Sequence, residues 1–555
     1  MAPGSSPRST PPDPSSDPRF VASSEPLPDP SRDPPFPVEP AAKRTLERLW
    51  DGGHAAFLVG GAVRDALLGR ATHDWDVATD ALPERILELF PEGSYENRFG
   101  TVLADGIEIT TFRRDHRYRD HRRPDEVTFT QDPVEDLSRR DFTVNAIAWG
   151  RGASSASSER PDSRRSPSPS PERPRSRRSS SPSPQRSAPP LALPDFLDPT
   201  GGRTDLESRI LRAVGDPDAR FEEDALRLLR GARISAEAGL QIEPLTLAAM
   251  TSHARDVTWV SGERIGIELR RMLGSPRPSD ALRILAETGI LESLFPELAA
   301  QRGVPQAKVT GHDLWEHTLA TVDAMVVIAP SDERLAVAAL FHDAGKPDTH
   351  ADGHFLGHPE VGAGIAREVL GRIAYPSRDA AYVARLIEEH MFQYSPAWTD
   401  AAVRRFMRRA GTDHMDDLLR LREADNVGSG VPEEAGGLEE LRARIEAERR
   451  RPAVLSLSQL AVDGNDVLVE VGRPPGPWVA VLLDRLLDSV VSDPARNTRE
   501  ALLSSARTWA AEDRSRATHE RHADRPMAPE RGPAADRPKA PERDPAADRA
   551  KAHRP

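Results

Sequence analysis

The sequence predicts an α/β domain near the N-terminus, followed by regions that are entirely helical. Between residues 41 and 150, short segments with strand character alternate with helical ones, as in AAFLVGG, AVRDALLG, WDVAT, IEITTFR and EVTFTQ. From about residue 205 onward, apolar residues recur with the helical period of about 3.6, as in EEDALRLLRGARISAEAG and SGERIGIELRRML. We therefore expect an α/β unit with a mixed sheet and several helical domains after it.

Three segments contain too few apolar residues to form a core, and we expect them to be disordered. Residues 1–40 are rich in Pro, Ser and Asp, residues 151–190 in Arg, Ser and Pro, and residues 512–555 repeat an APERxPAADR-like unit. The segment 151–190 interrupts what looks like one domain and carries nine arginines against three acidic residues. It is either an arm that attracts RNA or an inert extension of a loop.

Composition restricts the class of protein. The chain has 555 residues, enough for several domains, and no cysteine, which excludes disulfides and thiolate metal sites and leaves Asp, Glu and His as ligands. No stretch approaches the roughly 20 apolar residues of a membrane span, and the start MAPGSSPRSTPPDPSS lacks the apolar core of a signal peptide. We expect a soluble, cytoplasmic protein without a membrane partner. The net charge is −13, but Arg-rich runs at 113–123 and 404–409 supply local basic density.

Two carboxylates one residue apart follow a glycine turn in LVGGAVRDALLGRATHDWD. In a strand, residues i and i+2 point to the same face, so Asp74 and Asp76 would converge on one hard cation while Trp75 points away. Gly60 and Gly61 would let backbone amides approach a phosphate, because no Cβ stands in the way. A carboxylate pair beside a phosphate turn indicates phosphoryl or nucleotidyl transfer, in which Mg²⁺ neutralises the phosphate charge.

A row of arginines follows in LRLLRGAR. Arg227, Arg230 and Arg233 would lie on one side of a helix, where guanidinium groups match the oxygens of a triphosphate. The alternative is a solvated basic face that pairs with the acidic residues just before it, Glu222, Glu223 and Asp224.

Five motifs together resemble the class II tRNA nucleotidyltransferase and poly(A) polymerase family. In order they are GGAVRDALLG, DWD, RRDFTVNAIA, EDALRLLRGAR and SGERIGIEL, and they span roughly residues 57–270. The resemblance implies a polymerase-β-like nucleotidyltransferase head followed by a helical neck, body and tail. Gly231 and Ile234 stand where the family has Ala and Phe in RxLRAARF, which changes packing but no polar position.

The resemblance also implies roles for particular residues. Asp74 and Asp76 resemble the Mg²⁺ ligands, with Glu108 as a third carboxylate. Asp224 and Arg227 match a pair that acts as a protein template, reading the Watson–Crick edge of cytosine or adenine and rejecting guanine and uracil. The positions that match nucleotide-contacting residues are Gly60, Gly61, Arg64, Arg140, Arg230 and Arg233.

Residues 305–430 carry eight of the 16 histidines. His317, the adjacent pair His342 and Asp343, and Asp425 follow the order H…HD…D, which resembles the HD phosphohydrolase superfamily. The resemblance implies that these four residues bind a metal, and such N/O ligands suit Mn²⁺, Fe, Ni²⁺ or Zn²⁺.

Three further residues accompany this set. His358 and His390 either line the site or hold a second metal, and Lys346, in HDAGKP, faces a substrate phosphate.

The expected division of the chain follows from these motifs. The head comprises residues 41–150 and 191–215, the neck 216–304, the HD domain 305–430 and a helical body and tail 431–511. A neck of this kind would bind nucleotide and RNA.

The expected function is the template-independent addition of CCA to the 3′ end of tRNA from CTP and ATP, with a second phosphohydrolase activity. No obligatory protein partner is evident. The loop DHRYRDHRRP at 115–124 favours complete CCA addition, because the family uses that loop in the switch to ATP. The alternatives are a poly(A) polymerase, an enzyme that adds only CC or only A, and a metal-dependent HD phosphohydrolase whose head merely binds RNA.

Overall fold

The computed structural model describes residues 36–72, 74–97, 100–116, 126–152, 195–306, 310–330, 332–351, 354–451 and 455–523. The chain forms two compact units, one of residues 1–397 and 410–443 and the other of residues 398–409 and 444–555. Nearly all of the Arg-rich segment 151–190 and most of the loop 115–124 lie outside the described residues, as do most of the two terminal segments.

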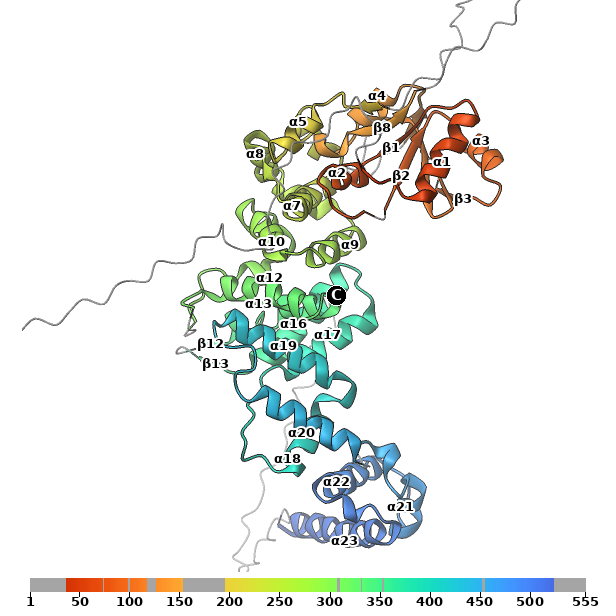
Figure 1. The fold of residues 1–555 in the computed structure, drawn as a ribbon. Coiled ribbons are helices and arrows are strands. Elements are labelled where there is room, and N and C mark those ends of the chain that lie inside the picture. Colours follow the sequence, from red (N-terminus) through yellow and green to blue (C-terminus); the bar gives the residue numbers. More distant parts are fainter. Residues whose placement is uncertain are drawn as a thin grey trace, which may run out of the picture. The chain divides into compact units, whose positions relative to one another are not determined.

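A seven-stranded mixed sheet forms the head, as the alternating strand and helix pattern predicts (Figure 1). The strand order is β3-β4-β5-β2-β1-β8-β9, and β2 and β5 run parallel while the other neighbouring pairs are antiparallel. The strands are β1 (Ala56–Val59), β2 (Asp76–Thr79), β3 (Ser94–Asn97), β4 (Thr101–Ala104), β5 (Ile107–Thr111), β8 (Ala148–Arg151) and β9 (Asp195–Leu197). A separate two-stranded ribbon pairs β6 (Arg113–His116) with β7 (Glu126–Phe129).

The Arg-rich segment 151–190 interrupts the head between two neighbouring strands of its sheet. β8 ends at Arg151 and β9 begins at Asp195, and the two pair in antiparallel register with Ala148 opposite Leu197. Since the sheet resumes beside the strand where it stops, residues on both sides of the segment 151–190 belong to one sheet.

An aromatic cluster extends the head before residue 41. Phe36 is buried, and its ring centroid lies 6.0 Å from that of Trp75, 6.2 Å from Trp149 and 6.3 Å from Phe196. The expectation of disorder over residues 1–40 is therefore wrong at Phe36. A single apolar residue among prolines carries no periodic signal, and only the sheet supplies its partners.

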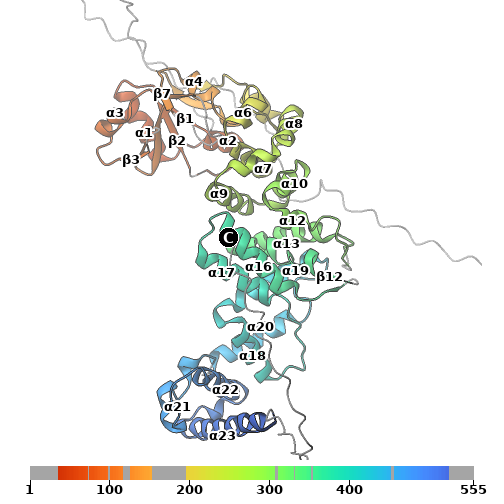
Figure 2. The ribbon, with the colours of Figure 1, turned by 180° about the vertical axis from the view of Figure 1, so that it is seen from behind.

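Helices cover the sheet and lead into the neck. The helix α1 (Pro40–Asp51) contacts β1, β2 and β5, and it lies beside α3 (Pro83–Leu89), as both ribbon views show (Figure 2). The remaining head helices are α2 (Gly61–Leu67), α4 (Pro133–Ser138) and α5 (Gly202–Glu207). The neck helices are α6 (Pro217–Glu223), α7 (Leu226–Ala238), α8 (Pro244–Ser252), α9 (Gly262–Leu273), α10 (Pro278–Glu287), α11 (Ile290–Leu294) and α12 (Pro296–Ala299).

The histidine-rich region is a bundle of helices. Its members pack in the pairs α13–α19, α13–α14 and α16–α17. They are α13 (Leu314–Ile328), α14 (Glu333–Phe341), α15 (Lys346–Thr349), α16 (His358–Arg372), α17 (Ser377–Glu389) and α19 (Met415–Gly428), with a short hairpin of β12 (His350–Ala351) and β13 (His354–Phe355).

The smaller unit has its own apolar core, formed by residues such as Leu486, Val490 and Leu502. The Arg-rich run 404–409 helps to build it, since the buried Arg404 donates to Glu448 and to the carbonyl of Val491. Among the described residues, no helix has the length and hydropathy needed to cross a membrane. The helices here are α18 (Asp400–Ala410), α21 (Gly464–Val471), α22 (Trp478–Ser492) and α23 (Arg499–Ala523), and α20 (Leu438–Arg450) belongs to this unit from residue 444 on. Because α23 extends to Ala523, the expectation of disorder from residue 512 is wrong for residues 512–523.

Two glycines allow α9 of the neck to pack closely against the end of α16. A Cβ atom on Gly262 would lie 2.1 Å from the carbonyl oxygen of Arg372, and one on Gly266 would lie 2.5 Å from that of Ile373. Neither distance is compatible with a side chain unless the backbone shifts. The approach of these two helices therefore depends on glycine at both positions.

We expect Gly262→Ala and Gly266→Ala each to lower the free energy of unfolding by about 1–3 kcal/mol, because the added methyl group overpacks the contact. The measurement is urea unfolding followed by helical circular dichroism. Gly364→Ala on α16 is the matched control, because no atom lies within 4 Å of its added Cβ. This control should be neutral or slightly stabilising. Equal behaviour of all three variants would contradict the close contact.

Candidate functional sites

Three carboxylates gather where β2 lies beside β5. The parallel register places Asp76 opposite Glu108. β2 begins at Asp76, so the strand expected from residue 75 is shorter at its start, and Asp74 lies in the segment just before it. Asp74 is exposed while Trp75 is buried, so these two side chains point in different directions, as the alternation predicts.

The electrostatics of this group fit a cation site. Burial raises the pKa of the Asp76 carboxyl to about 6; Arg140 acts against this shift, and Glu108 and Asp74 add to it. Three acidic groups that disfavour each other's charge are stabilised when a cation sits among them. Carboxylate oxygens are the ligands that Mg²⁺ prefers, so the donor set fits that ion.

The glycine turn brings a guanidinium to these carboxylates. Gly60 has a φ of 79°, which favours glycine, and a Cβ there would lie 3.2 Å from Nη1 of Arg140 and 3.5 Å from Oδ2 of Asp76. The structure therefore joins Gly60, Arg140 and Asp76, which the sequence predicts as parts of one site.

Arg64 and Gly61 lie against each other in the same turn. The Arg64 guanidinium donates to both carboxylate oxygens of Asp65 and to Oδ1 of Asn145 at 2.8 Å. A Cβ on Gly61 would lie 3.5 Å from Nη2 of Arg64. Sequence reasoning missed Asn145, although it lies inside the motif RRDFTVNAIA.

The arginine row of α7 is not an open basic face. Each arginine contacts an acidic residue: Arg227 with Glu223 at 2.6 Å, Arg230 with Asp141 at 2.7 Å, and Arg233 with Glu268 at 2.6 Å and Glu237 at 2.8 Å. The alternative of acidic pairing is thus right for Arg227. For Arg230 and Arg233 the acidic partners differ from those that the alternative predicts. They are Asp141 of the head, Glu268 of α9 and Glu237 of α7 itself. Spacing along one helix cannot reveal partners that tertiary packing supplies.

The Asp141 carboxylate is buried, while the Arg230 side chain that pairs with it is 32% exposed. Burial by itself would raise the pKa of Asp141, but the charge of Arg230 holds it well below its ordinary value. Asp141 in turn raises the pKa of Arg230. Both groups therefore stay charged at neutral pH, and together they connect the head to α7.

Asp224 lies at a break in the neck. It follows α6 and precedes α7, with extended backbone angles (φ −152°, ψ 104°). Its carboxylate receives two hydrogen bonds from Arg264 of α9, at 2.6 and 3.1 Å. Arg227 instead donates to Glu223 and to the carbonyls of Arg220 and Arg139. The expected template pair is thus held by two different sets of partners.

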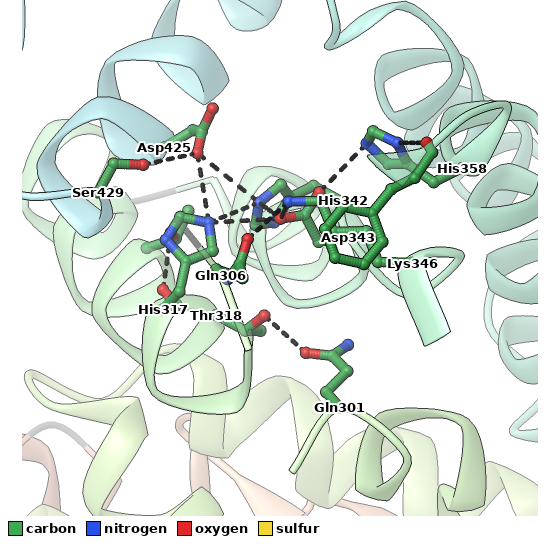
Figure 3. A network of polar contacts seen from close by, with 12 residues as sticks. Gln301, Gln306, His317, Thr318, His342, Asp343, Lys346, His358, Asp425 and Ser429 are labelled. Carbon is green, nitrogen blue, oxygen red and sulfur yellow. Dashed lines mark hydrogen bonds and ion pairs between the residues drawn. The ribbon is translucent and has the colours of Figure 1, made fainter. Parts of the chain in front are cut away.

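The six residues expected at the HD site come together in the bundle. Figure 3 labels five of them, His317, His342, Asp343, His358 and Asp425. All six are buried. They form two groups, within each of which the possible ligand atoms lie within 4.8 Å of one another: His317, His342 and Asp425, and Asp343, His358 and His390.

Asp343 belongs to the second group and also faces the two histidines of the first. Its Oδ2 is 3.1 Å from Nε2 of His342 and 3.4 Å from Nε2 of His317. Its Oδ1 is 3.4 Å from Nε2 of His358 and 3.6 Å from Nε2 of His390. One carboxylate thus faces one histidine pair with each oxygen.

The histidine tautomers are set by the backbone. Nδ1 of His342, His358 and His390 lies 2.6–2.8 Å from a carbonyl oxygen three residues earlier in each case. A carbonyl only accepts, so Nδ1 carries the proton and Nε2 presents its lone pair to the site. Nε2 of His358 and of His390 is buried without a hydrogen-bond partner among the described residues. Imidazole lone pairs and a carboxylate that face one another form a set of donors suited to a divalent transition metal.

A cavity of about 590 Å³ opens on this centre. Asp343, His358 and Asp425 line it together with two cations, Lys346 and Arg422. Lys346 donates to Oδ2 of Asp343 at 2.6 Å. Four apolar residues, Phe355, Leu356, Met391 and Val431, also line the cavity.

Three known protein families match consecutive parts of the chain. The Poly A polymerase head domain matches residues 56–156, the probable RNA and SrmB-binding site of polymerase A matches 239–302, and the HD domain matches 314–427. The fold and the matches thus define a nucleotidyltransferase head joined to an HD domain.

Similar proteins identify the family. The chain is 31% identical over 465 residues to the CCA-adding enzyme of Geobacillus stearothermophilus, covering 82% of this chain and 94% of that protein. It is 31% identical over 475 residues to that of Geobacillus kaustophilus, covering 85% and 95%. A crystal structure of the Bacillus stearothermophilus CCA-adding enzyme in complex with CTP matches with a TM-score of 0.58 and 27% identity, covering 87% of this chain and all of that one. The chain belongs to the CCA-adding enzyme family, which confirms the resemblance, and it is a nucleotidyltransferase.

The raised pKa of Asp76 predicts a pH-dependent stability in the absence of divalent cations. Its folded pKa of about 6 exceeds the ordinary 3.8, so its contribution to stability is present below pH 3.8 and is lost as the pH rises through 6. Asp76→Asn should therefore raise the free energy of unfolding at pH 8 by about 2 kcal/mol, and much less near pH 4. The measurement is urea unfolding in EDTA at both pH values.

Magnesium provides the control for this experiment. Excess Mg²⁺ at pH 8 should stabilise the natural protein more than Asp76→Asn, because ligand binding to the folded state adds to stability. An unchanged difference between the two proteins in EDTA and in Mg²⁺ would argue against a cation site at Asp76.

Proposed function

We propose that the chain adds cytidine, cytidine and adenosine to the 3′ end of tRNA from CTP and ATP, without a nucleic-acid template. The observation that carries this proposal is the meeting of Asp76 and Glu108 with Asp74, Gly60 and Arg140 at one edge of β2 and β5. The proposal is supported by the similarity of the chain to two CCA-adding enzymes over 94% and 95% of their length. Such an enzyme would work on tRNA in the cytoplasm.

We assign the cation site of the head to Asp74 and Asp76, assisted by Glu108. Bound Mg²⁺ would neutralise the triphosphate and lower the charge barrier to attack by the RNA 3′-hydroxyl. Gly60 and Gly61 let the chain approach the phosphates closely. Among the guanidinium groups, Arg140 is the one whose Nη1 is next to Gly60, and it would balance the triphosphate charge.

The other nucleotide contacts fall in the turn and the neck. Arg64 lies over Gly61, and Arg230 acts on the Asp76 carboxyl through its charge. Arg233 holds α9 through its hydrogen bond to Glu268. We assign base selection to Asp224 and Arg227, the first as hydrogen-bond acceptor and the second as donor. The neck around residues 216–304 would then bind both the nucleotide and the end of the RNA.

A second activity is proposed for the HD domain at residues 305–430. The observation that favours it is the complete set of buried ligands, three of which line a cavity together with Lys346 and Arg422. A divalent metal bound there would supply a Lewis acid and an activated water for phosphoester hydrolysis. Lys346 and Arg422 would hold the phosphate charge, and phosphoesters or 2′,3′-cyclic phosphates at RNA ends are the proposed substrates.

The substrate experiment incubates the full chain with tRNA lacking CCA, tRNA ending in CC, and an unrelated oligo(A). Each is offered CTP, ATP or both, and the products are sized. We expect CCA on the first RNA, a single adenosine on the second and little extension of the third. Long adenosine tails without cytidine would instead indicate a poly(A) polymerase, and CC or A alone would indicate a partial enzyme.

Separate variants distinguish the two centres. Asp76→Asn should abolish nucleotide addition and spare phosphoester hydrolysis, because Asp343 and its partners are untouched. Asp343→Asn should do the reverse. Loss of both activities in both variants would contradict two separate sites. Hydrolysis without addition in the natural protein would favour an HD phosphohydrolase whose head only binds RNA.

Metal stoichiometry tests the second group of HD ligands. In an Asp76→Asn background, which removes the head site, we expect Mn²⁺ titration of the metal-free protein to detect two bound ions per chain. His358→Ala should leave one. His354→Ala is the matched control, since His354 lines the same cavity but belongs to neither ligand group. One ion in both the parent and His358→Ala would show that this group holds no metal.

A further inference from the structure

We propose that Arg264 is a positioning residue for nucleotide selection, because it holds the Asp224 carboxylate in one orientation. The inference rests on the proposed function, in which Asp224 reads the incoming base. Arg264 lies 40 residues beyond Asp224, on α9 of the neck.

The backbone around Asp224 is held, but its side chain would be free to turn without a further contact. The carbonyl of Asp224 accepts from the amide of Arg227 at 3.0 Å, and Oδ1 accepts from the amide of Leu226 at 3.1 Å. A single bond to Oδ1 restrains one oxygen and leaves the plane of the carboxylate undefined. The orientation of Oδ2 must therefore come from another group.

Arg264 supplies that orientation with two parallel hydrogen bonds. Its Nη1 donates to Oδ1 of Asp224 at 3.1 Å, and its Nη2 donates to Oδ2 at 2.6 Å. A planar guanidinium that contacts both oxygens fixes the plane of a carboxylate, which the ammonium of a lysine cannot do. The two side chains remain 20% and 18% exposed, so a ligand can still reach the carboxylate.

The arrangement leaves room for one more donor. A carboxylate has about four lone-pair positions, and among the described residues three donors reach that of Asp224: the Leu226 amide and the two Arg264 nitrogens. The open position is on Oδ2. Cytosine and adenine each present an amino donor at the edge where uracil and guanine present a carbonyl oxygen. A carboxylate held in one orientation would accept a hydrogen bond from cytosine or adenine and would repel the carbonyl oxygen of uracil or guanine.

The helix that carries Arg264 is itself held on two sides. Gly262 and Gly266 lie against the carbonyls of Arg372 and Ile373, and Glu268 accepts from Arg233 at 2.6 Å. Arg264 is therefore presented to Asp224 by a preorganised element, which reduces the cost of ordering the site when a nucleotide binds.

The test compares nucleotide discrimination in the full chain with Mg²⁺ and a tRNA transcript that lacks CCA. The readout is kcat/KM for CTP divided by kcat/KM for UTP. Because both values come from one preparation, their ratio does not depend on the fraction of protein that is folded. We expect Arg264→Gln to lower the ratio at least about tenfold, as expected when a hydrogen-bond acceptor is no longer oriented, and Arg264→Lys to lower it less.

Two further variants separate the possible results. Arg271→Gln is the matched control, since Arg271 lies on the same helix with a largely exposed side chain, and its ratio should not change. Equal losses for CTP and UTP at an unchanged ratio in the Arg264 variants would overturn the inference and leave Arg264 as a contact between helices. If Arg264→Gln shows no activity, the ratio of Arg264→Lys decides in the same way.

Asp224→Ala reports on the proposed function itself. If it lowers the ratio while the Arg264 variants do not, base reading by Asp224 stands and only the positioning role fails. If Asp224→Ala leaves the ratio unchanged, base reading by Asp224 fails first, and a lowered ratio in Arg264→Gln would then have to act through another residue.

Discussion

The ion pair between the buried carboxylate of Asp141 and the partly exposed guanidinium of Arg230 is the constraint on which the catalytic half of the molecule depends. A buried charge is costly unless it is paired, so the head and α7 must stay together for the Asp141 carboxylate to be accommodated. Arg230 also acts through its charge on Asp76 and is itself affected by Asp224. The Arg230 guanidinium therefore interacts by charge with Asp76 and Asp141 of the head and with Asp224 at the break in the neck.

The same rule shapes the HD centre, with a different solution. Asp343 is fully buried, and burial would raise its pKa; the cationic and hydrogen-bonding groups around it, Lys346 among them, instead hold the pKa well below its ordinary value. An ionised carboxylate among imidazole lone pairs is a site organised for cations. In the head, where Asp76 has no such excess of positive charge, the pKa shift has the opposite direction. The chain therefore contains two acidic centres in which the protein shifts a carboxyl pKa in opposite directions, down at Asp343 and up at Asp76.

Several features could be predicted from local sequence because short-range rules determine them. The glycine at 60 signals a turn that side chains rarely adopt, and the alternation around Trp75 orients Asp74 and Asp76. The order of His317, His342, Asp343 and Asp425 identifies the HD set through resemblance, and the structure brings these residues together. Prediction was wrong where the signal was weak, as at Phe36, which stands alone among prolines, and at the end of α23, where the charged segment 512–523 continues the helix.

The sequence by itself determined the classes of chemistry: carboxylates after a glycine turn, an Asp–Arg template motif, and an HD ligand order without cysteine. Only the tertiary structure decided which acidic and basic side chains form ion pairs with each other. Arg230 and Arg233 find Asp141 and Glu268, and Asp224 finds Arg264, all from other elements. The physical reason is that a helix period specifies which side chains share a face. The partner of a buried charge is instead set by packing between elements distant in sequence.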